Sequence, residues 1–131
     1  MTRLPIAAGR DQRLDKWLYL AYHRDVGEKD YVTFLGESNT DRYRHYHMWE
    51  RGRIVTFRIQ YEALIEGEWR PIVRYDTAHG YSHKDVMHPD GTQSKEKFPY
   101  YSNAEVLTYG QRDIRRKWRR YREAYEQEMK R

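Results

Sequence analysis

Apolar and polar residues alternate most regularly in the middle of the chain. Within residues 54–65, apolar side chains occupy every second position from Phe57 to Ile65, and Arg58, Gln60 and Glu62 lie between them. A period of two is typical of a strand with one apolar and one polar face. We predict strands over residues 43–50, 54–65 and 69–76, joined by tight turns at Gly52 and Gly67.

The turn between the second and third of these strands decides which side chains share a face. A loop over residues 66–68 gives two apolar pairs, Ile59 with Tyr75 and Tyr61 with Val73. The polar face of this hairpin is then predicted to hold Arg58, Gln60, Arg74 and Asp76.

The turn before residue 54 is harder to place. A two-residue turn at Arg51-Gly52 puts Tyr46 opposite Phe57 and directs His45 and His47 to the polar face. A three-residue loop reverses this, because a slip of one residue moves every side chain to the other face. We favour the two-residue turn, since an X-Gly pair suits it.

The flanking segments predict two further strands and two helices. Residues 31–35 and 83–87 are expected to form short strands, and residues 11–24 a short helix. A long helix over residues 103–129 follows a capping box formed by Ser102 and Glu105, with a restart after Gly110 as an alternative. Its apolar stripe comprises Ile114, Trp118, Tyr121 and Tyr125.

These elements predict a single α+β domain over residues 1–131, with residues 1–10 as a flexible arm. The sheet should be antiparallel, with about four to five strands. We expect the short N-terminal helix and the long C-terminal basic amphipathic helix to pack on one face of it. The 13 Tyr and 4 Trp predict a core edged with polar contacts, because buried hydroxyl and indole groups need partners.

The net charge of +5 belongs to the C-terminal helix alone. Residues 112–131 contain nine Lys or Arg and four Asp or Glu, and the rest of the chain is balanced. Such a helix favours an acidic partner, either RNA or an acidic, antitoxin-like protein. The residues predicted to bind nucleic acid are Arg58, Arg112, Arg115, Arg116, Arg119 and Arg120.

The chain has no Cys, which excludes disulfides, thiolate metal sites and a cysteine nucleophile. No stretch approaches the roughly 20 apolar residues of a membrane span. We expect a cytoplasmic protein with no membrane partner and no cofactor, and its oligomeric state stays open.

The segment from residue 74 to residue 91 concentrates His and Asp. In one interpretation it cleaves RNA without a metal: imidazoles act as acid and base near neutral pH and arginines bind the phosphate. The catalytic residues would be His79, His83, Arg74 and Asp76. In a second, it binds a metal through His79, His83, Asp85 and His88, although this spacing matches no standard motif. In a third, these side chains only cap turns.

The run Arg74-Tyr-Asp-x2-His-Gly-x2-His-x-Asp-x2-His-Pro-Asp-Gly91 resembles a group of small bacterial and archaeal domains that includes the TumE-like toxins of type II toxin–antitoxin modules. The resemblance implies an antiparallel α+β fold and a toxin role, through RNA, inhibited by an antitoxin. It points to Arg74, Asp76, His79, His83, Asp85, His88 and Asp90.

The leading functional hypothesis is therefore a toxin-like, RNA-directed protein acting as a metal-independent ribonuclease. A non-enzymatic binding module that uses the basic helix is the first alternative. A metal-dependent hydrolase that uses the His/Asp segment is the second.

Overall fold

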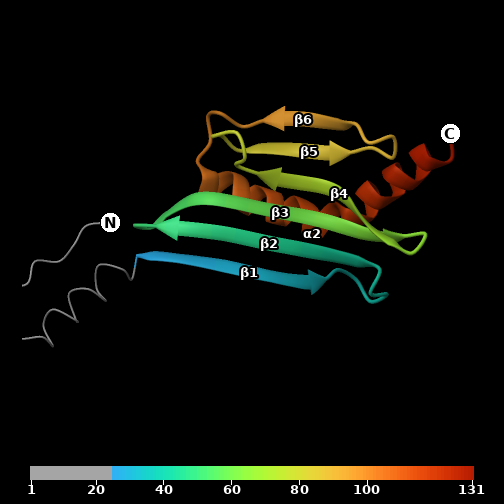
Figure 1. Cartoon of the computed structure of the whole chain (residues 1–131), viewed down its shortest axis with the longest axis horizontal. Coiled ribbons are helices and arrows are strands. Elements are labelled where there is room, and N and C mark those ends of the chain that lie inside the picture. Colours follow the sequence, from blue (N-terminus) through green and yellow to red (C-terminus); the bar gives the residue numbers. More distant parts are fainter. Residues whose placement is uncertain (1–24) are drawn as a thin grey trace, which may run out of the picture.

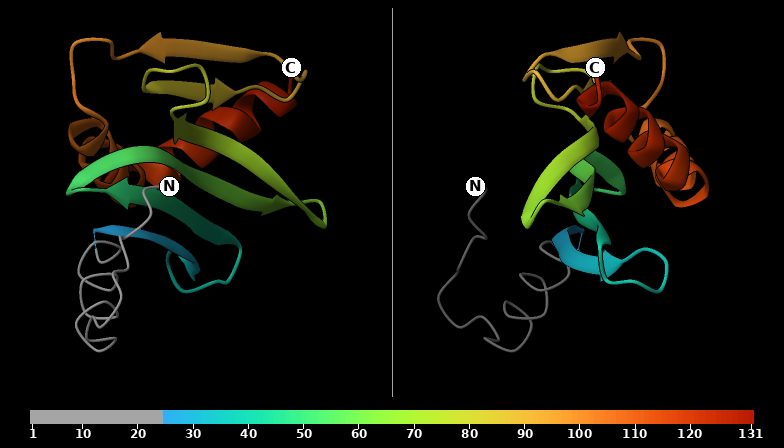
Figure 2. Two further views of the ribbon diagram at one scale, coloured as in Figure 1. Left: turned by 60° about the vertical axis from the view of Figure 1, so that its left-hand side comes forward. Right: turned by 90° about the vertical axis from the view of Figure 1, so that its right-hand side faces the viewer.

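The computed structural model describes residues 25–131 as one antiparallel sheet and one long helix (Figure 1). The strands lie in chain order: β1 (Val26–Phe34), β2 (Asp41–Glu50), β3 (Arg53–Ile65), β4 (Glu68–Asp76), β5 (His83–Met87) and β6 (Gln93–Lys97). The helix α2 (Asn103–Met129) lies across β3 and β4 on one face of the sheet (Figure 2). The α+β prediction is confirmed, with six strands instead of four to five. The arm and helix expected before residue 25 lie outside the described residues.

The core lies between α2 and the apolar face of the sheet. The helix passes closest at Gly110, where an added Cβ would lie 2.9 Å from Ile59 Cδ1 and 2.9 Å from Tyr75 Cγ. Only glycine allows this approach. The helix α2 runs unbroken through Gly110 and does not restart there. The predicted capping box is present, with Ser102 Oγ accepting from the Glu105 amide at 3.1 Å.

Buried carboxylates satisfy the tyrosines of this core. Asp113 of α2 accepts hydrogen bonds from the Tyr75 and Tyr121 hydroxyls, each at 2.6 Å. Asp41 of β2 accepts from the Tyr61 hydroxyl at 2.5 Å and from Arg122 at 2.9 Å. Helix and sheet are therefore joined by polar contacts as well as by apolar packing, as the composition predicted.

The β3–β4 pairing agrees with the prediction. Ile59 lies opposite Tyr75 and Tyr61 opposite Val73. The connection differs: a two-residue turn at Glu66-Gly67, both with positive φ, is followed by a bulge at Tyr61/Glu62, where the pairing slips by one residue. The bulge compensates for the shorter turn, so the predicted polar face is retained.

The β2–β3 hairpin has the predicted two-residue turn, and its predicted pairing is wrong. Arg51 and Gly52 both have positive φ, as that turn requires. A bulge between Met48 and Trp49 then shifts the register, so Tyr46 pairs with Arg58 and His47 with Phe57. His45 and His47 therefore lie on the face that α2 covers in part, and not on the polar face.

The ends of the sheet were predicted less well than its centre. β5 has the predicted bounds, whereas β1 begins at Val26, five residues earlier than expected. β6 was not predicted, because its sequence QSKEK has no apolar residue and every one of its residues is exposed. Strand formation there depends on pairing with β5 and not on burial.

His45 is held as a neutral imidazole inside the fold. Its Nδ1 lies 2.7 Å from the Tyr43 hydroxyl, and its Nε2 lies 2.5 Å from Nδ1 of His47. Burial, and then the neighbouring His47 and Lys29, lower the pKa of His45 to about 4. One proton on Nε2 satisfies both contacts, so protonating the ring would break the chain of hydrogen bonds.

We expect this imidazole to make the fold sensitive to acid. In the unfolded chain the pKa of a histidine is about 6.5. Between pH 6.5 and pH 4 the unfolded state therefore binds a proton at this residue that the folded state does not bind. The free energy of unfolding should fall through that window by about 3 kcal/mol in total. Urea denaturation at pH 7 and pH 4 measures the fall, which should be much smaller in His45→Gln. An equal fall in His45→Gln and in the native chain would contradict this origin.

Candidate functional site

Polar side chains cover the face of the sheet opposite α2. The strand registers bring them into two rows that run across the strands. One row holds Asp30, Tyr46, Arg58, Asp76, His83 and Lys97. The next holds Arg44, Gln60, Arg74, Asp85 and Lys95. The site predicted around residues 74–85 thus lies in the centre of a wide polar surface.

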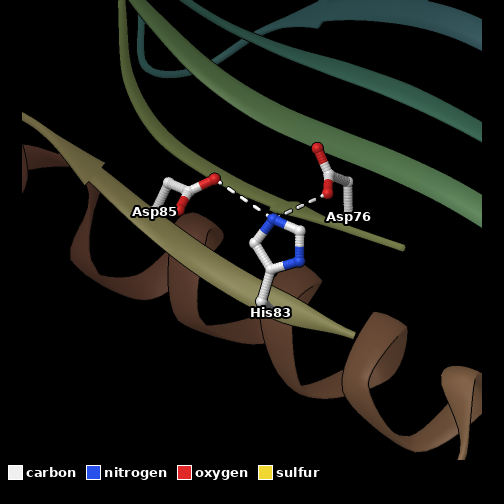
Figure 3. Close-up of side chains that lie close together, drawn as sticks. All are labelled: Asp76, His83 and Asp85. Atoms are coloured by element: carbon white, nitrogen blue, oxygen red, sulfur yellow. Dashed lines mark ion pairs between the residues drawn. The ribbon is translucent and has the colours of Figure 1, made fainter. Parts of the chain in front are cut away.

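His83 lies between two carboxylates at the β4–β5 hairpin (Figure 3). Its Nε2 is 3.0 Å from Asp76 Oδ1 and 3.3 Å from Asp85 Oδ2. Asp76 ends β4 directly opposite His83, and Asp85 follows two residues later on the same face of β5. All three residues are buried, and each is at most 3 % exposed.

This geometry leaves one carboxylate oxygen of the cluster without a hydrogen bond. Nε2 carries at most one proton, yet it faces two carboxylate oxygens, so one proton must serve both. Asp85 Oδ1 is buried and accepts no hydrogen bond, and Lys95 is the nearest cation to it, at 3.7 Å. Buried carboxylates are stable only when they are paired or bind a metal.

The donor atoms are spaced as metal ligands are. One ligand atom from each of Asp76, His83 and Asp85 lies within 4.8 Å of the others. A cation bound octahedrally at about 2.1 Å holds neighbouring ligand atoms about 3.0 Å apart. The two contacts of Nε2 are close to this length. Carboxylate oxygen and imidazole nitrogen suit Mg²⁺, Mn²⁺ or Zn²⁺.

Arginines surround the acidic cluster. Arg58 contacts Asp76 Oδ2 at 3.3 Å, and its side chain is 55 % exposed, so it can turn towards a ligand. Arg74 donates to Gln60 at 2.7 Å. Burial, and then repulsion by Arg58, lower the pKa of Arg74 below its usual value. A bound anion would relieve both effects.

A shallow hollow beside the cluster can take such an anion. It has a volume of about 270 Å³, and its polar lining comprises Arg44, Arg58, Arg74, Gln60 and the carboxylates of Asp30 and Glu62. Glu62 at its edge is already paired with Arg42 and Arg44. Arg58 and Arg74 therefore remain as the cations able to bind a phosphate next to Asp76.

The four predicted catalytic residues lie near one another. Arg74, Asp76 and His83 belong to the rows described above, and the ring of His79 lies over that of His83 at 5.6 Å between centroids, with 29° between the planes. His79 is exposed on the β4–β5 loop, whereas both nitrogens of His83 face acceptors, since Nδ1 lies 3.4 Å from the Tyr81 carbonyl. The two rings stack and do not converge on a common point.

The predicted metal ligands do not form one set. His88 lies beyond the end of β5, where its Nδ1 contacts Glu128 of α2 at 2.9 Å and its Nε2 contacts Ser94 at 2.7 Å. The structure places His88 apart from His83 and Asp85, because the alternation that puts those two on the polar face of β5 does not include position 88. Asp76 was missing from that set, although the motif contains it. Asp90 accepts from Thr92 in the following turn.

The predicted nucleic-acid residues also divide between two surfaces. Arg58 lies on the polar face, whereas Arg112, Arg115, Arg116, Arg119 and Arg120 are exposed on α2. Lys95 was missed because it belongs to β6, which has no apolar alternation to reveal it. Gln60 was predicted on the polar face but not as a site residue, and nothing in the sequence distinguishes Arg44 from the other strand residues.

Comparison with known proteins adds a family and no activity. No curated protein and no solved structure matches the chain. Over residues 25–131, no helix combines the length and apolar character needed to cross a membrane. One family model, described as a domain of unknown function, matches residues 26–131, from β1 to the end of the chain. Nothing in that description concerns TumE-like toxins, so that resemblance stays a prediction. The chain belongs to the DUF7718 family.

Proposed function

We propose that this protein is a divalent-metal-dependent phosphodiesterase that acts on RNA, with Asp76, His83 and Asp85 as the metal ligands. The observation that carries the proposal is the buried convergence of these three side chains, whose donor atoms lie within 4.8 Å of one another. Oδ1 of Asp85 supports it, since this buried atom accepts no hydrogen bond, has Lys95 only at 3.7 Å, and offers the negative charge and lone pairs that a cation needs.

Each neighbouring residue has a role in this reaction. A bound ion would supply Lewis acidity, which polarises a phosphoryl oxygen and lowers the pKa of a water. That water would lose a proton to solvent and bond through its oxygen to phosphorus while the bond to the leaving ester oxygen breaks, and the leaving oxygen would take up a proton from solvent. Arg58 and Arg74 would bind the phosphate and stabilise the charge that develops on it. Arg58 must leave Asp76 for this, which its exposed side chain permits.

The metal-free mechanism fits this site less well. It needs two imidazoles that both reach the scissile phosphate, one as a base and one as an acid. His79 is accessible, whereas His83 is 2 % exposed and is held between Asp76 and Asp85. His83 would first have to break both contacts, so the metal-dependent reaction is the simpler use of these residues.

RNA is the proposed substrate for two reasons. The basic surface of the chain favours a polyanion, and the resemblance to TumE-like toxins implies RNA. The rows of polar residues form an open surface and not a deep pocket, which suits a polymer better than a small phosphate ester.

The test combines metal binding with cleavage. Protein stripped with a chelator is titrated with Mn²⁺ by calorimetry, and end-labelled single-stranded RNA and DNA are incubated with it in Mg²⁺, Mn²⁺ or chelator. We expect one Mn²⁺ site, cleavage that requires the metal, and loss of both in His83→Ala. His88→Ala is the matched control, because it removes a histidine of the same motif from outside the cluster and should keep both.

The other outcomes are also informative. Cleavage that persists in chelator and is lost in His79→Ala would establish the metal-free mechanism instead. No Mn²⁺ binding and no cleavage would mean that the cluster is a buried ion-pair network that serves only the fold.

A further inference from the structure

A second surface lies on the opposite side of the sheet, next to α2. The helix lies across β3 and β4, and the same face of the sheet continues beside it onto β2 and β1 (Figures 1 and 2). The residues of β1 and β2 on this face include Lys29, Tyr31, His45, His47 and Trp49. The bulge that moved the histidines of β2 away from the polar face also places them here.

Aromatic rings follow one another along this part of the sheet. Tyr31 of β1 stacks on His45 at 4.7 Å between centroids, with 13° between the planes. Along β2, His45 lies 4.8 Å from His47, and His47 lies 5.5 Å from Trp49. The ring of Trp49 lies over Gly27, where an added Cβ would be 2.3 Å from it. Tyr31, His47 and Trp49 are each only partly buried, so their rings are accessible in part.

Arginines of α2 lie at the Tyr43 end of this row of rings. The guanidinium of Arg115 lies 4.7 Å from the ring centre of Tyr43, whose ring is 6.1 Å from that of Tyr31. Arg119, about one turn further along α2, lies 4.2 Å from the ring centre of Trp118 of the same helix. Arg112 lies about one helical turn before Arg115. Thr108, Gln111, Arg112, Arg115 and Arg116 line a hollow of about 350 Å³ on the exposed side of the helix.

The charge of these arginines is not compensated within residues 25–131. Two carboxylates of α2 are used elsewhere: Asp113 is buried and pairs with Lys84 and Lys117, and Glu126 pairs with Arg122. Glu123, four residues after Arg119, is exposed and lies beside it in a shallow hollow. No carboxylate of the described residues forms an ion pair with Arg112, Arg115 or Arg119. The Tyr43 end of the aromatic row is therefore strongly positive.

From this combination we infer that the surface binds single-stranded nucleic acid. We name it the aromatic–arginine surface and define it by Tyr31, His47, Trp49, Arg112, Arg115 and Arg119. Guanidinium groups bind phosphates through paired hydrogen bonds, and unpaired bases stack on aromatic rings. An acidic protein would use the arginines but would gain little from a row of stacked rings, so the rings favour nucleic acid.

This inference does not depend on the proposed phosphodiesterase. The aromatic–arginine surface and the cluster of Asp76, His83 and Asp85 lie on opposite faces of the sheet. Binding at the first can exist without catalysis at the second. His83→Ala should therefore abolish cleavage and leave this binding unchanged.

The test compares two pairs of basic residues on the same helix. Lys117 follows Arg115 by two residues and Arg120 follows Arg119 by one, so they lie about 200° and about 100° further round the helix. Affinity for a short labelled oligonucleotide, as RNA and as DNA, is measured by fluorescence anisotropy at salt concentrations from about 50 to about 200 mM. Arg115→Ala/Arg119→Ala should weaken binding at least about tenfold and reduce the salt slope by about 1.4, since each phosphate contact on a single strand contributes about 0.7. Lys117→Ala/Arg120→Ala should have a clearly smaller effect on both.

Trp49→Leu tests the stacking directly. Leucine still covers Gly27 with an apolar side chain, so β1 should keep its place while the ring is lost. Affinity should fall about tenfold with an unchanged salt slope, because stacking contributes no released counterions. Circular dichroism of each variant checks the fold.

Three results would overturn the inference. Equal losses of affinity in the two double variants would mean general attraction to a charged helix. Competition by polyglutamate as strong as that by RNA, with no effect of Trp49→Leu, would assign the surface to an acidic protein. Absence of binding to both RNA and DNA would rule out the inference altogether.

Discussion

Asp76→Asn is expected to lower the metal-dependent cleavage of RNA by about 1000-fold or more, equivalent to about 4 kcal/mol in transition-state free energy. The substitution removes one of the two negative charges that would hold the ion and replaces a carboxylate ligand with a weaker amide oxygen. The side-chain shape is kept, and the amide oxygen can still accept the Ala78 N–H that Asp76 Oδ1 accepts at 3.1 Å. The fold should therefore survive while the metal site fails.

Single-turnover cleavage with Mn²⁺ in excess measures this effect, and a Mn²⁺ titration shows whether affinity or turnover is lost. Asp90→Asn is the matched control, since it changes an aspartate of the same motif that lies in the β5–β6 turn and contacts Thr92. Its activity should stay within a few-fold of the native value. Full activity in Asp76→Asn would show that Asp76 serves only the ion pairs with Arg58 and His83.

Asp113→Ala is expected to lower the free energy of unfolding by about 4 kcal/mol, within the range for breaking a buried charged network. Asp113 is 6 % exposed and accepts both tyrosine hydroxyls at 2.6 Å, and Lys84 of β5 lies 3.5 Å from it. Removing the carboxylate leaves Tyr75, Tyr121 and Lys84 without this partner. Each then lacks a hydrogen bond or an opposite charge inside the fold, where such a loss costs more free energy than at the surface.

The midpoint of urea denaturation, at an unchanged m-value, measures this loss. Glu123→Ala removes an exposed carboxylate from the same helix and should change stability by less than about 0.5 kcal/mol. Tyr121→Phe should cost about 2 kcal/mol, because two hydrogen bonds are lost, one to Asp113 and one from Lys84, while the charge of Asp113 stays paired. If Asp113→Ala cost no more than Tyr121→Phe, the carboxylate would not be the link between α2, β4 and β5.

The centre of the sheet was predictable because burial imposes its pattern on the sequence. β3 alternates so regularly that a loop over residues 66–68 was chosen to join two apolar faces, and the resulting pairing of Ile59 with Tyr75 is correct. The same alternation correctly predicts that Arg58, Arg74 and Asp76 share the opposite, polar face. The β3–β4 pairing survived an error in the turn length, since matching two apolar faces constrains register more strongly than the turn does.

The rest of the site depends on features that leave no periodic signal. The bulge of the β2–β3 hairpin moved His45 and His47 to the other face, and neither residue type marks a bulge. β6 forms without an apolar residue, so Lys95 could not be placed. His88 lies apart from His83 and Asp85 because it follows the last residue of β5 and falls outside their alternation, although the bounds of β5 were predicted correctly.

The order of the elements along the chain has a consequence for synthesis on the ribosome. The six strands pair with their neighbours in sequence, so each hairpin can form soon after its second strand emerges. The apolar face of β3 and β4 has to wait for α2, which is made after all of them and covers Ile59 and Tyr75 only when Gly110 reaches them. Until then the nascent sheet exposes its most apolar surface. A chain stalled between β6 and α2 should therefore aggregate or need a chaperone, whereas the finished chain does not.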